Sequence, residues 1–177
     1  MKHWDVVINL IKESKLEVIG EIGVWKGHLL QNVLSSEIGK NIKEYWAIDP
    51  YQIMGEEHGR MGKMTQKDWD QMFNKVSNNL KRFNNLRLLR MTSERASEIF
   101  PVNFFDFVYL DACHFYDFMI EDIQRWSPLI KKEGFLAGDG WGIGESKGHK
   151  VKEAVLTLYD KKEIELYPDS VWVKQIN

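Results

Sequence analysis

Hydrophobic residues recur along this chain with two different spacings. Short apolar runs predict strands, and longer segments with apolar residues three or four positions apart predict helices. The predicted strands are residues 16–22, 44–49, 86–91, 107–110, 134–138, 164–167 and 170–174. The predicted helices are residues 5–11, 28–38, 66–83, 92–100, 118–130 and 151–159. The first lies within a leading segment 1–15, and the fifth is expected to end near Pro128.

The order of these elements predicts the class of fold. Strands and helices alternate, which is typical of an α/β fold with a mostly parallel sheet and helices on both faces. The last two strands follow each other across Pro168 and Asp169, so we expect an antiparallel hairpin. The expected architecture is a mostly parallel, seven-stranded sheet that ends in this C-terminal hairpin. A chain of 177 residues lies within the usual size of one domain, so residues 1–177 are expected to form one.

One segment, residues 51–64, departs from both spacings. It contains Gly55, Gly59 and Gly62 together with three methionines and shows no period. Long irregular segments in compact domains are usually functional or disordered. Because methionine adapts to varied apolar surfaces, one interpretation is a lid over a bound substrate. The other is a loop that is disordered without ligand.

Composition and charge narrow the classes of function. Hydrophobic residues make up 44% of the chain and charged residues 28%, which excludes a globally disordered protein. The formal net charge of −2 gives no basic surface for nucleic acid or anionic membranes, so neither partner is expected. Cys113 is the only cysteine, and no apolar run approaches the length of a membrane span. We expect a cytoplasmic protein, and the sequence is compatible with a homodimer.

Carboxylates stand at the ends of four predicted strands. Glu21 and Asp49 close the first two strands, and Asp111 and Asp139 follow the fourth and the fifth. The carboxyl ends of parallel strands meet at one edge of a sheet, where ligands of open α/β folds bind. Negative side chains gathered there repel phosphates and favour ribose hydroxyls, a cationic ligand or a metal ion.

The turn after the first strand favours a ligand without a pyrophosphate. Residues 20–27 read G-E-I-G-V-W-K-G, which is not the G-x-G-x-x-G fingerprint of dinucleotide-binding sites. Asp49 lies 22 residues after Gly27, near the spacing expected for an acid that holds ribose hydroxyls. A nucleoside that carries positive charge fits these features. S-adenosylmethionine, with its sulfonium, α-ammonium and ribose groups, is such a molecule.

Three segments resemble those of known methyltransferases. E-I-G-V-W-K-G at 21–27 resembles the first motif of class I methyltransferases, and Y-W-A-I-D-P at 45–50 resembles their second-strand acid. Residues 106–142, with D-F-V-Y-L-D-A-C-H-F-Y and A-G-D-G-W-G, look like a stretch of the small-molecule methyltransferase family that includes macrocin O-methyltransferase. The resemblance covers about residues 17–175. It implies a Rossmann-like class I methyltransferase fold, S-adenosylmethionine as cofactor and methylation of a hydroxyl on a small-molecule acceptor.

The resemblance also implies roles for residues around the cofactor. Gly23 would allow close approach of the methionine part, with Glu21 near its ammonium group. Asp49 would accept hydrogen bonds from the ribose hydroxyls, and Ser93 would lie beside the adenine. The position of Trp25 in the same turn, rather than the resemblance, suggests that its ring would stack on a planar acceptor or attract the sulfonium through cation–π forces. A hydrophobic plug over the end of the sheet is the alternative for this tryptophan.

The resemblance also implies that Asp111 and His114 take part in the reaction itself. Either His114 as general base, or Asp111 together with a metal ion, would remove the proton of an acceptor hydroxyl. Asp111 would also contribute to the cofactor site. Asp111 and Asp139 would hold a divalent ion such as Mg²⁺ in relatives that use one. This chain has Asp139-Gly140 where such relatives often have two consecutive acids, so it offers Mg²⁺ one oxygen ligand fewer.

Several of these residues also have ordinary structural explanations. Gly23 could serve only a tight turn, because glycine tolerates positive φ with or without a ligand. Asp111 could cap the helix that follows it, and His114 could be packed among its aromatic neighbours. For the whole chain, the alternative to an enzyme is a methyltransferase-like module that binds S-adenosylmethionine or a nucleoside without turnover. The missing second acid at Gly140 favours that alternative.

Overall fold

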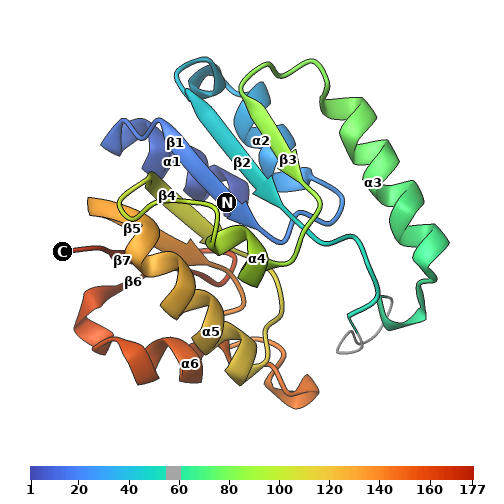
Figure 1. The fold of residues 1–177 in the computed structure, drawn as a ribbon. Coiled ribbons are helices and arrows are strands. Elements are labelled where there is room, and N and C mark those ends of the chain that lie inside the picture. Colours follow the sequence, from blue (N-terminus) through green and yellow to red (C-terminus); the bar gives the residue numbers. More distant parts are fainter. Residues whose placement is uncertain (55–60) are drawn as a thin grey trace.

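A seven-stranded sheet runs through the molecule, with helices on both of its faces (Figure 1). The computed structural model describes residues 1–54 and 61–177. The strands are β1 (Val18–Ile22), β2 (Glu44–Ile48), β3 (Leu86–Leu89), β4 (Phe105–Leu110), β5 (Ile130–Gly138), β6 (Ile164–Tyr167) and β7 (Val171–Gln175). The helices are α1 (His3–Ser14), α2 (His28–Ser35), α3 (Gln66–Leu80), α4 (Ser93–Ser97), α5 (Tyr116–Trp126) and α6 (Val151–Leu158).

The strands are arranged in the order β3-β2-β1-β4-β5-β7-β6. Strands β1 to β5 pair in parallel, and β7 pairs antiparallel with both β5 and β6. The chain changes direction along the sheet between β1 and β4, which is where ligands bind in open α/β folds. The predicted sheet, mostly parallel with a C-terminal antiparallel hairpin, is confirmed.

Two apolar clusters attach the helices to the sheet. Helices α1, α2 and α3 pack on one face, against strand residues such as Phe107 and Tyr109. Helices α4, α5 and α6 pack on the other face, against Leu110 and Leu136. Strand β4 contributes to both clusters because neighbouring side chains of a strand point to opposite faces. Its burial on both sides explains the nearly continuous apolar run F-D-F-V-Y-L.

The central parallel strands end at the same level. Ile22 of β1 pairs with Ile48 of β2 and with Leu110 of β4. Just beyond them, the backbone N–H of Gly23 donates to the carbonyl of Ile48 at 2.9 Å, and that of Asp111 donates to the carbonyl of Ile22 at 2.8 Å. The residues that follow these three strands therefore start side by side.

The predicted boundary between the fifth helix and the fifth strand is wrong by several residues. Helix α5 ends at Trp126, and Ser127–Leu129 form a 3₁₀ turn. Strand β5 begins at Ile130, where it already pairs with β4. Ile130 is buried, but the polar residues 131–133 follow it, and the register with β4 shifts here between Phe105 and Phe107. The ammonium group of Lys131 reaches the carboxylate of Asp106 at 2.7 Å. Because these residues are polar, the hydrophobic pattern did not predict that the strand begins at Ile130.

The predicted lid segment is described only at its ends, because residues 55–60 lie outside the described residues. Tyr51, at its beginning, is buried in the core, and Ile53 and Met54 are exposed. The lid therefore stays a prediction.

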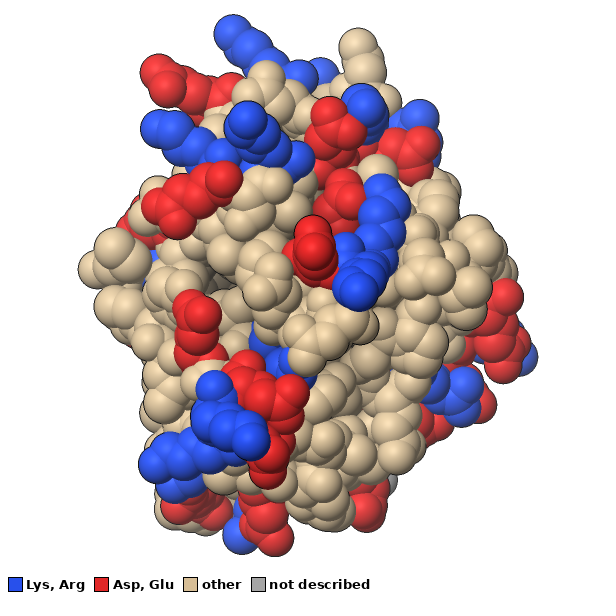
Figure 2. Space-filling view, turned by 90° about the vertical axis from the view of Figure 1, so that its left-hand side faces the viewer, with Lys and Arg blue, Asp and Glu red and all other residues tan. Residues whose placement is uncertain are grey.

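Charged side chains of both signs are interspersed on the face shown in Figure 2. This distribution agrees with a formal net charge of only −2. Within residues 1–54 and 61–177, no helix has both the length and the apolar character that spanning a membrane requires.

Candidate functional site

The predicted acidic residues gather at one edge of the sheet. Glu21 lies near the end of β1, Asp49 directly follows β2, and Asp111 and Asp139 directly follow β4 and β5. The pKa of the Asp111 carboxyl is raised well above its usual value, first by burial and then by the neighbouring Asp139, with further contributions from Glu21 and Asp49. Asp111 therefore lies close enough to the other three acids to be affected by their charge.

The turn that follows β1 and begins at Gly23 packs directly against the end of β4. Gly23 has a φ of +90°, and a Cβ atom on it would lie 2.1 Å from the backbone carbonyl oxygen of Asp111. Only glycine avoids that collision, so the backbone itself requires Gly23 whether or not a ligand is bound. The approach of a cofactor to this residue stays a prediction.

The carboxylate of Asp49 holds the same turn in place. Its Oδ2 atom accepts hydrogen bonds from the backbone N–H groups of Val24 (2.9 Å) and Trp25 (2.8 Å), and its Oδ1 atom accepts one from Tyr51 (2.8 Å). Burial raises the pKa of Asp49, and the three N–H groups lower it. A carboxylate can accept about four hydrogen bonds, so roughly one position remains. The predicted bond to a ribose hydroxyl would use that position.

Trp25 lines a pocket of about 500 Å³ between this turn and helix α3, together with Met64, Met72 and Val76. The ammonium group of Lys26 lies 4.3 Å from the centre of the indole ring. The indole N–H is buried and has no hydrogen-bond partner among the described residues. A cation already lies over this ring, so the predicted contact with a sulfonium or an acceptor stays a prediction.

Glu21 is buried inside the sheet, with only 1% of its surface exposed. The hydroxyl of Tyr45 donates to its Oε2 atom at 2.6 Å. Burial raises the pKa of Glu21 to about 8, although the hydrogen bond from Tyr45 lowers it. The hydroxyls of Tyr51 and Tyr109 are buried as well and have no hydrogen-bond partner among residues 1–54 and 61–177.

The sequence did not predict this group of tyrosines, because each reads as an ordinary residue of a buried element. The available signal was Glu21 itself, since a carboxyl inside a buried strand needs a hydrogen-bond donor. Tyr109 lies directly beside Glu21 in the register of β1 and β4. Unpartnered buried hydroxyls next to a carboxyl fit a polar, positively charged ligand group, such as the ammonium group of S-adenosylmethionine.

Ser93, the first residue of α4, forms hydrogen bonds with two residues of helix α5. Its hydroxyl donates to the carboxylate of Asp122 and accepts from the indole N–H of Trp126 at 2.8 Å. Burial raises the pKa of Asp122 to about 6, against the lowering effect of Ser93. The spacing of Asp122 and Trp126 puts them on one face of a helix, but it does not show which element they face. The predicted position of Ser93 beside an adenine stays a prediction.

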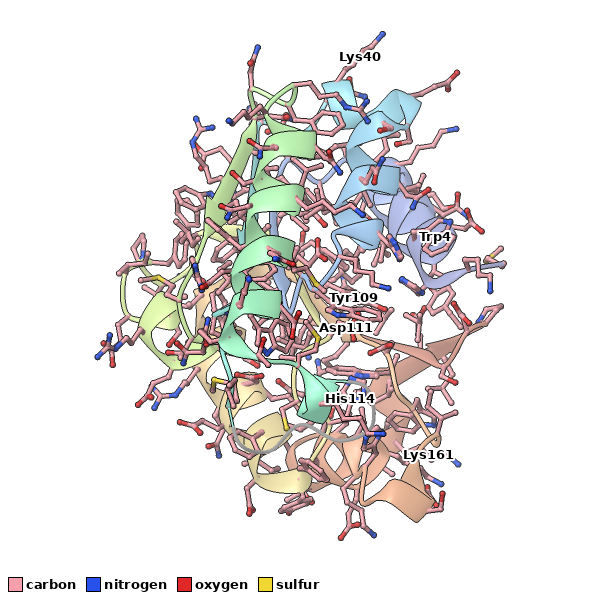
Figure 3. The ribbon with its side chains drawn as sticks, turned by 90° about the vertical axis from the view of Figure 1, so that its right-hand side faces the viewer. Trp4, Lys40, Tyr109, Asp111, His114 and Lys161 are labelled. Carbon is pink, nitrogen blue, oxygen red and sulfur yellow. The ribbon has the colours of Figure 1, made fainter. Side chains whose placement is uncertain are left out.

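Asp111, His114 and Asp139 form a compact cluster beyond β4 and β5; Figure 3 labels the first two. One ligand atom from each residue lies within 4.8 Å of the others. The Nε2 atom of His114 is 3.1 Å from Oδ1 of Asp139 and 3.7 Å from Oδ1 of Asp111. The sequence predicts Asp111 and Asp139 as metal ligands and His114 as a general base. The geometry brings all three into one donor set.

This donor set fits a divalent cation. The Nε2 atom of His114 and the Oδ1 atom of Asp139 are buried, and neither has a hydrogen-bond partner among the described residues. The two atoms approach each other to 3.1 Å without forming a hydrogen bond, and leaving buried polar atoms without hydrogen bonds costs free energy. Ligands at about 2.1 Å from an octahedral ion lie roughly 3 Å apart when they occupy neighbouring positions, which matches the separation of these two atoms.

A family model described as a methyltransferase domain matches residues 21–141. The matched residues include the turn at Gly23, Asp49 and the cluster of Asp111, His114 and Asp139. The chain belongs to this methyltransferase domain family. It is an S-adenosylmethionine-dependent methyltransferase.

Solved structures with the same fold include three methyltransferases of low sequence identity. A proposed caffeoyl-CoA O-methyltransferase from Staphylococcus aureus has a TM-score of 0.69 and 16% identity, over 98% of this chain and 82% of that one. Methyltransferase PaMTH1 from Podospora anserina, solved with S-adenosylhomocysteine, has a TM-score of 0.66 and 15% identity, over 98% and 77%. The O-methyltransferase NovP has a TM-score of 0.65 and 15% identity, over 98% and 78%. No curated protein matches the sequence. At these identities the likeness shows the fold alone.

Proposed function

We propose that this methyltransferase transfers the methyl group of S-adenosylmethionine to a hydroxyl oxygen of a small molecule. In this reaction the bond between the methyl carbon and sulfur breaks, and a bond between that carbon and the acceptor oxygen forms. The sulfonium becomes a neutral thioether, and the hydroxyl proton has to leave. The observation that carries the proposal is the cluster of Asp111, His114 and Asp139, because groups that can take up or displace this proton lie beside the turn at Gly23.

The chain's main contribution to catalysis would be positioning. Asp49 fixes the backbone of the first turn with three hydrogen bonds, so little reorganisation is needed when the cofactor binds. Glu21 and the unpartnered hydroxyls of Tyr51 and Tyr109 would receive the ammonium end of the cofactor. A divalent ion held by the acidic cluster would lower the pKa of a hydroxyl bound to it. The names of two proteins with the same fold, both O-methyltransferases, support oxygen as the acceptor atom.

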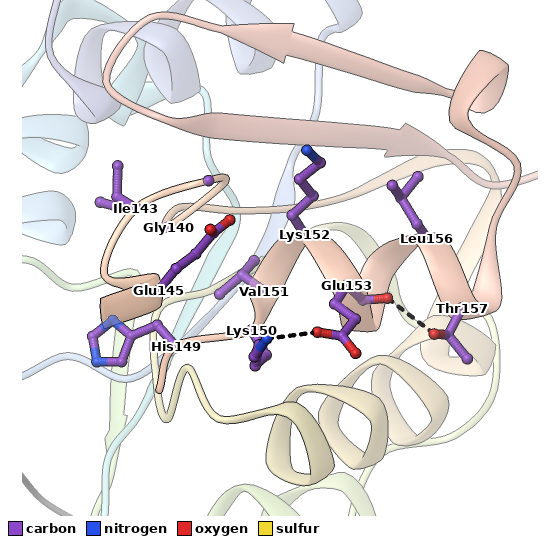
Figure 4. Close-up of a pocket in the computed structure, with 11 residues that line it drawn as sticks. Gly140, Ile143, Glu145, His149, Lys150, Val151, Lys152, Glu153, Leu156 and Thr157 are labelled. Atoms are coloured by element: carbon purple, nitrogen blue, oxygen red, sulfur yellow. Dashed lines mark hydrogen bonds and ion pairs between the residues drawn. The ribbon is translucent and has the colours of Figure 1, made fainter. Parts of the chain in front are cut away.

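A pocket beside the cluster has the size of a small-molecule site (Figure 4). Its volume is about 470 Å³, and it is lined by the loop after β5 and by helix α6. Gly140 belongs both to the wall of this pocket and to the surroundings of His114. Lys150 and Glu153, which pair at 3.0 Å, are among its charged lining residues. Charges of both signs favour a polar acceptor with several hydrogen-bonding groups.

The test is a methyl-transfer assay with the purified chain and S-adenosylmethionine. Panels of phenols, sugar hydroxyls and amines are offered with and without divalent ions, and mass spectrometry follows the methylated product and S-adenosylhomocysteine. We expect an O-methylated product, whose formation His114→Ala slows while the affinity for S-adenosylhomocysteine stays nearly unchanged in calorimetry. Binding of the cofactor without turnover of any acceptor would support the non-catalytic module instead. Methylation of amines alone would overturn oxygen as the acceptor.

A further inference from the structure

Trp25 has a backbone conformation that bulky residues rarely adopt. Its φ is +47°, in the left-handed region that favours glycine. This conformation costs free energy for a residue with a Cβ atom, and it persists only where the surroundings or a function require it. Gly23 and Gly27, on either side, also have positive φ, and glycine tolerates such angles without that cost. The turn itself therefore does not explain why residue 25 is a tryptophan.

Apolar packing does not explain the indole ring of Trp25 either. Its N–H group is buried and has no hydrogen-bond partner among the described residues. A buried donor without an acceptor costs free energy, and a phenylalanine ring would pack here without that cost. Trp25 lines a pocket, so an unpaired donor on this residue fits a ligand that supplies an oxygen atom.

The pocket that Trp25 lines is separate from the proposed site of methyl transfer. It lies between the turn after β1, the start of α2 and helix α3, and both helices cover the same face of the sheet (Figure 1). Its volume of about 500 Å³ falls within the range of small-molecule sites. It shares no lining residue with the pocket at Gly140, and neither Asp111 nor His114 belongs to its lining. We call it the Trp25 pocket.

The charged side chains of the Trp25 pocket favour an anion. Lys26 and Lys75 line it, and neither forms an ion pair with a carboxylate in the described part of the chain. Asp68 is the acid in the lining, and its Oδ2 atom already accepts hydrogen bonds from the backbone N–H (2.8 Å) and the hydroxyl (2.7 Å) of Thr65. Two ammonium groups therefore remain for a negatively charged ligand.

The apolar side chains of the pocket favour a ligand with an aromatic body. Met64 and Met72 line it together with the indole of Trp25. Thioether sulfurs make favourable contacts with aromatic rings, and methionine adapts its shape to the ring that it meets. Aromatic rings also pair favourably with an indole. One part of the pocket thus suits a flat apolar group and another part an anionic group.

We propose that the Trp25 pocket binds a small organic anion with an aromatic body. The rings of this ligand lie beside Trp25 and the two methionines, and its carboxylate lies near Lys26 and Lys75. A carboxylate oxygen accepts the hydrogen bond that the indole N–H of Trp25 does not make within the described chain. This site is additional to the methyl-transfer site, so the proposal does not depend on the proposed function.

The test uses 1-naphthoate as the probe and the purified chain labelled with nitrogen-15. Nuclear magnetic resonance follows the indole N–H signals, and the signal that is lost in Trp25→Phe belongs to Trp25. We expect 1-naphthoate to shift this signal with a Kd below about 1 mM. The indole N–H of Trp172 is also buried and without a partner among the described residues, so it is the internal control and should not shift. Trp172→Phe identifies its signal.

A double variant tests the role of the positive charges. Lys26→Gln combined with Lys75→Gln should weaken 1-naphthoate binding by about tenfold, because the carboxylate loses both ammonium groups. Lys67→Gln combined with Lys81→Gln is the matched control and should retain the affinity. It removes the same charge from exposed positions that lie outside the lining of the Trp25 pocket. Circular dichroism checks that both double variants fold.

Two further probes separate the anionic and aromatic parts of the ligand. The neutral alcohol 1-naphthalenemethanol has the same rings without the carboxylate, and we expect it to bind at least about tenfold more weakly than 1-naphthoate. Inorganic phosphate has the charge without the rings and should not shift the Trp25 signal. S-adenosylhomocysteine should not displace 1-naphthoate, because the proposed site is separate from the cofactor.

Four results would overturn this inference. They are a Trp25 signal that 1-naphthoate does not shift, equal affinity for the neutral alcohol, equal loss of affinity in both double variants, and displacement of the probe by S-adenosylhomocysteine. The last result would assign the pocket to the cofactor site. None of these measurements needs turnover, so their failure leaves the proposed methyl transfer untouched, and a chain that binds 1-naphthoate but methylates nothing contradicts only the proposed function.

Discussion

The carboxylate of Asp49 fastens the backbone of Trp25, whose N–H group donates to Oδ2 of Asp49 at 2.8 Å. Val24 and Tyr51 donate to the same carboxylate, so one side chain fixes the turn after β1 and the segment after β2. We expect Asp49→Ala to weaken binding of S-adenosylmethionine by about tenfold or more, which is about 1.4 kcal/mol. Calorimetric titration measures this change.

Removing a carboxylate that accepts backbone hydrogen bonds also lowers the stability of the fold. The control is therefore a second carboxylate of this kind, far from the predicted cofactor site. Asp106 accepts hydrogen bonds from the backbone N–H groups of Glu17 (2.9 Å) and Val18 (2.7 Å), at the amino end of the strands. Asp106→Ala should destabilise the fold by about 1–3 kcal/mol and leave cofactor affinity intact. Equal loss of cofactor affinity in both variants would show that Asp49 acts only through the fold.

A second prediction concerns the buried pair of Tyr45 and Glu21. Tyr45→Phe removes the hydroxyl that donates to Glu21, and it leaves a fully buried carboxyl without that donor. We expect the free energy of unfolding to fall by about 1–3 kcal/mol. Tyr51→Phe is the matched control, because the hydroxyl it removes has no hydrogen-bond partner in the described part of the chain. Urea unfolding should show that variant as stable as the parent or more so, and a larger loss in Tyr51→Phe would contradict the assignment.

A third prediction concerns the pH dependence of stability through Asp122. Burial raises the pKa of this carboxyl from an ordinary 3.8 to about 6 in the folded chain. Between about pH 4 and pH 6 the folded state therefore holds a proton that the unfolded state has released, and stability falls as pH rises through this window. Asp122→Asn should remove the contribution of this carboxyl, so stability should fall less steeply between pH 4 and pH 6, and the variant should be more stable than the parent at pH 7 by up to about 3 kcal/mol.

Urea unfolding at pH 4, 5, 6 and 7 measures the effect of Asp122→Asn. The amide keeps an oxygen that can accept from Ser93, so the contact between α4 and α5 survives the substitution. Asp117→Asn, an exposed position on the same helix, is the control and should keep the pH dependence of the parent. The same pH dependence of stability in the parent and in Asp122→Asn would contradict the raised pKa of Asp122.

The fold could be predicted because burial leaves a direct mark on the sequence. Strands such as β4 are apolar on both faces, so their residues stand out as continuous runs. The acids Asp49, Asp111 and Asp139 could be predicted as a group because each directly follows a parallel strand, and such strands end at one edge. The start of β5 could not be predicted, because Ile130 is followed by the polar residues 131–133 before the apolar run of the strand begins.

The partners of the site residues could not be predicted, because they depend on how helices lie against the sheet. Nothing in the spacing of Ser93 and Asp122 shows that α4 and α5 exchange a hydrogen bond. The bond between Tyr45 and Glu21 depends likewise on which faces of β2 and β1 meet. Strand register and helix packing are long-range properties. They decide whether the side chain of a predicted site residue can bind a ligand or already has a hydrogen-bond partner within the protein.

Gly23 in the predicted cofactor turn packs directly against the backbone carbonyl of Asp111 in the proposed ion site. The conformations of these two parts of the site therefore depend on each other. Any side chain at Gly23 would displace the backbone that carries a proposed metal ligand. Attempts to re-engineer the cofactor preference of this chain at position 23 would therefore disturb the proposed ion site as well, and variation is better directed to neighbours that do not touch β4.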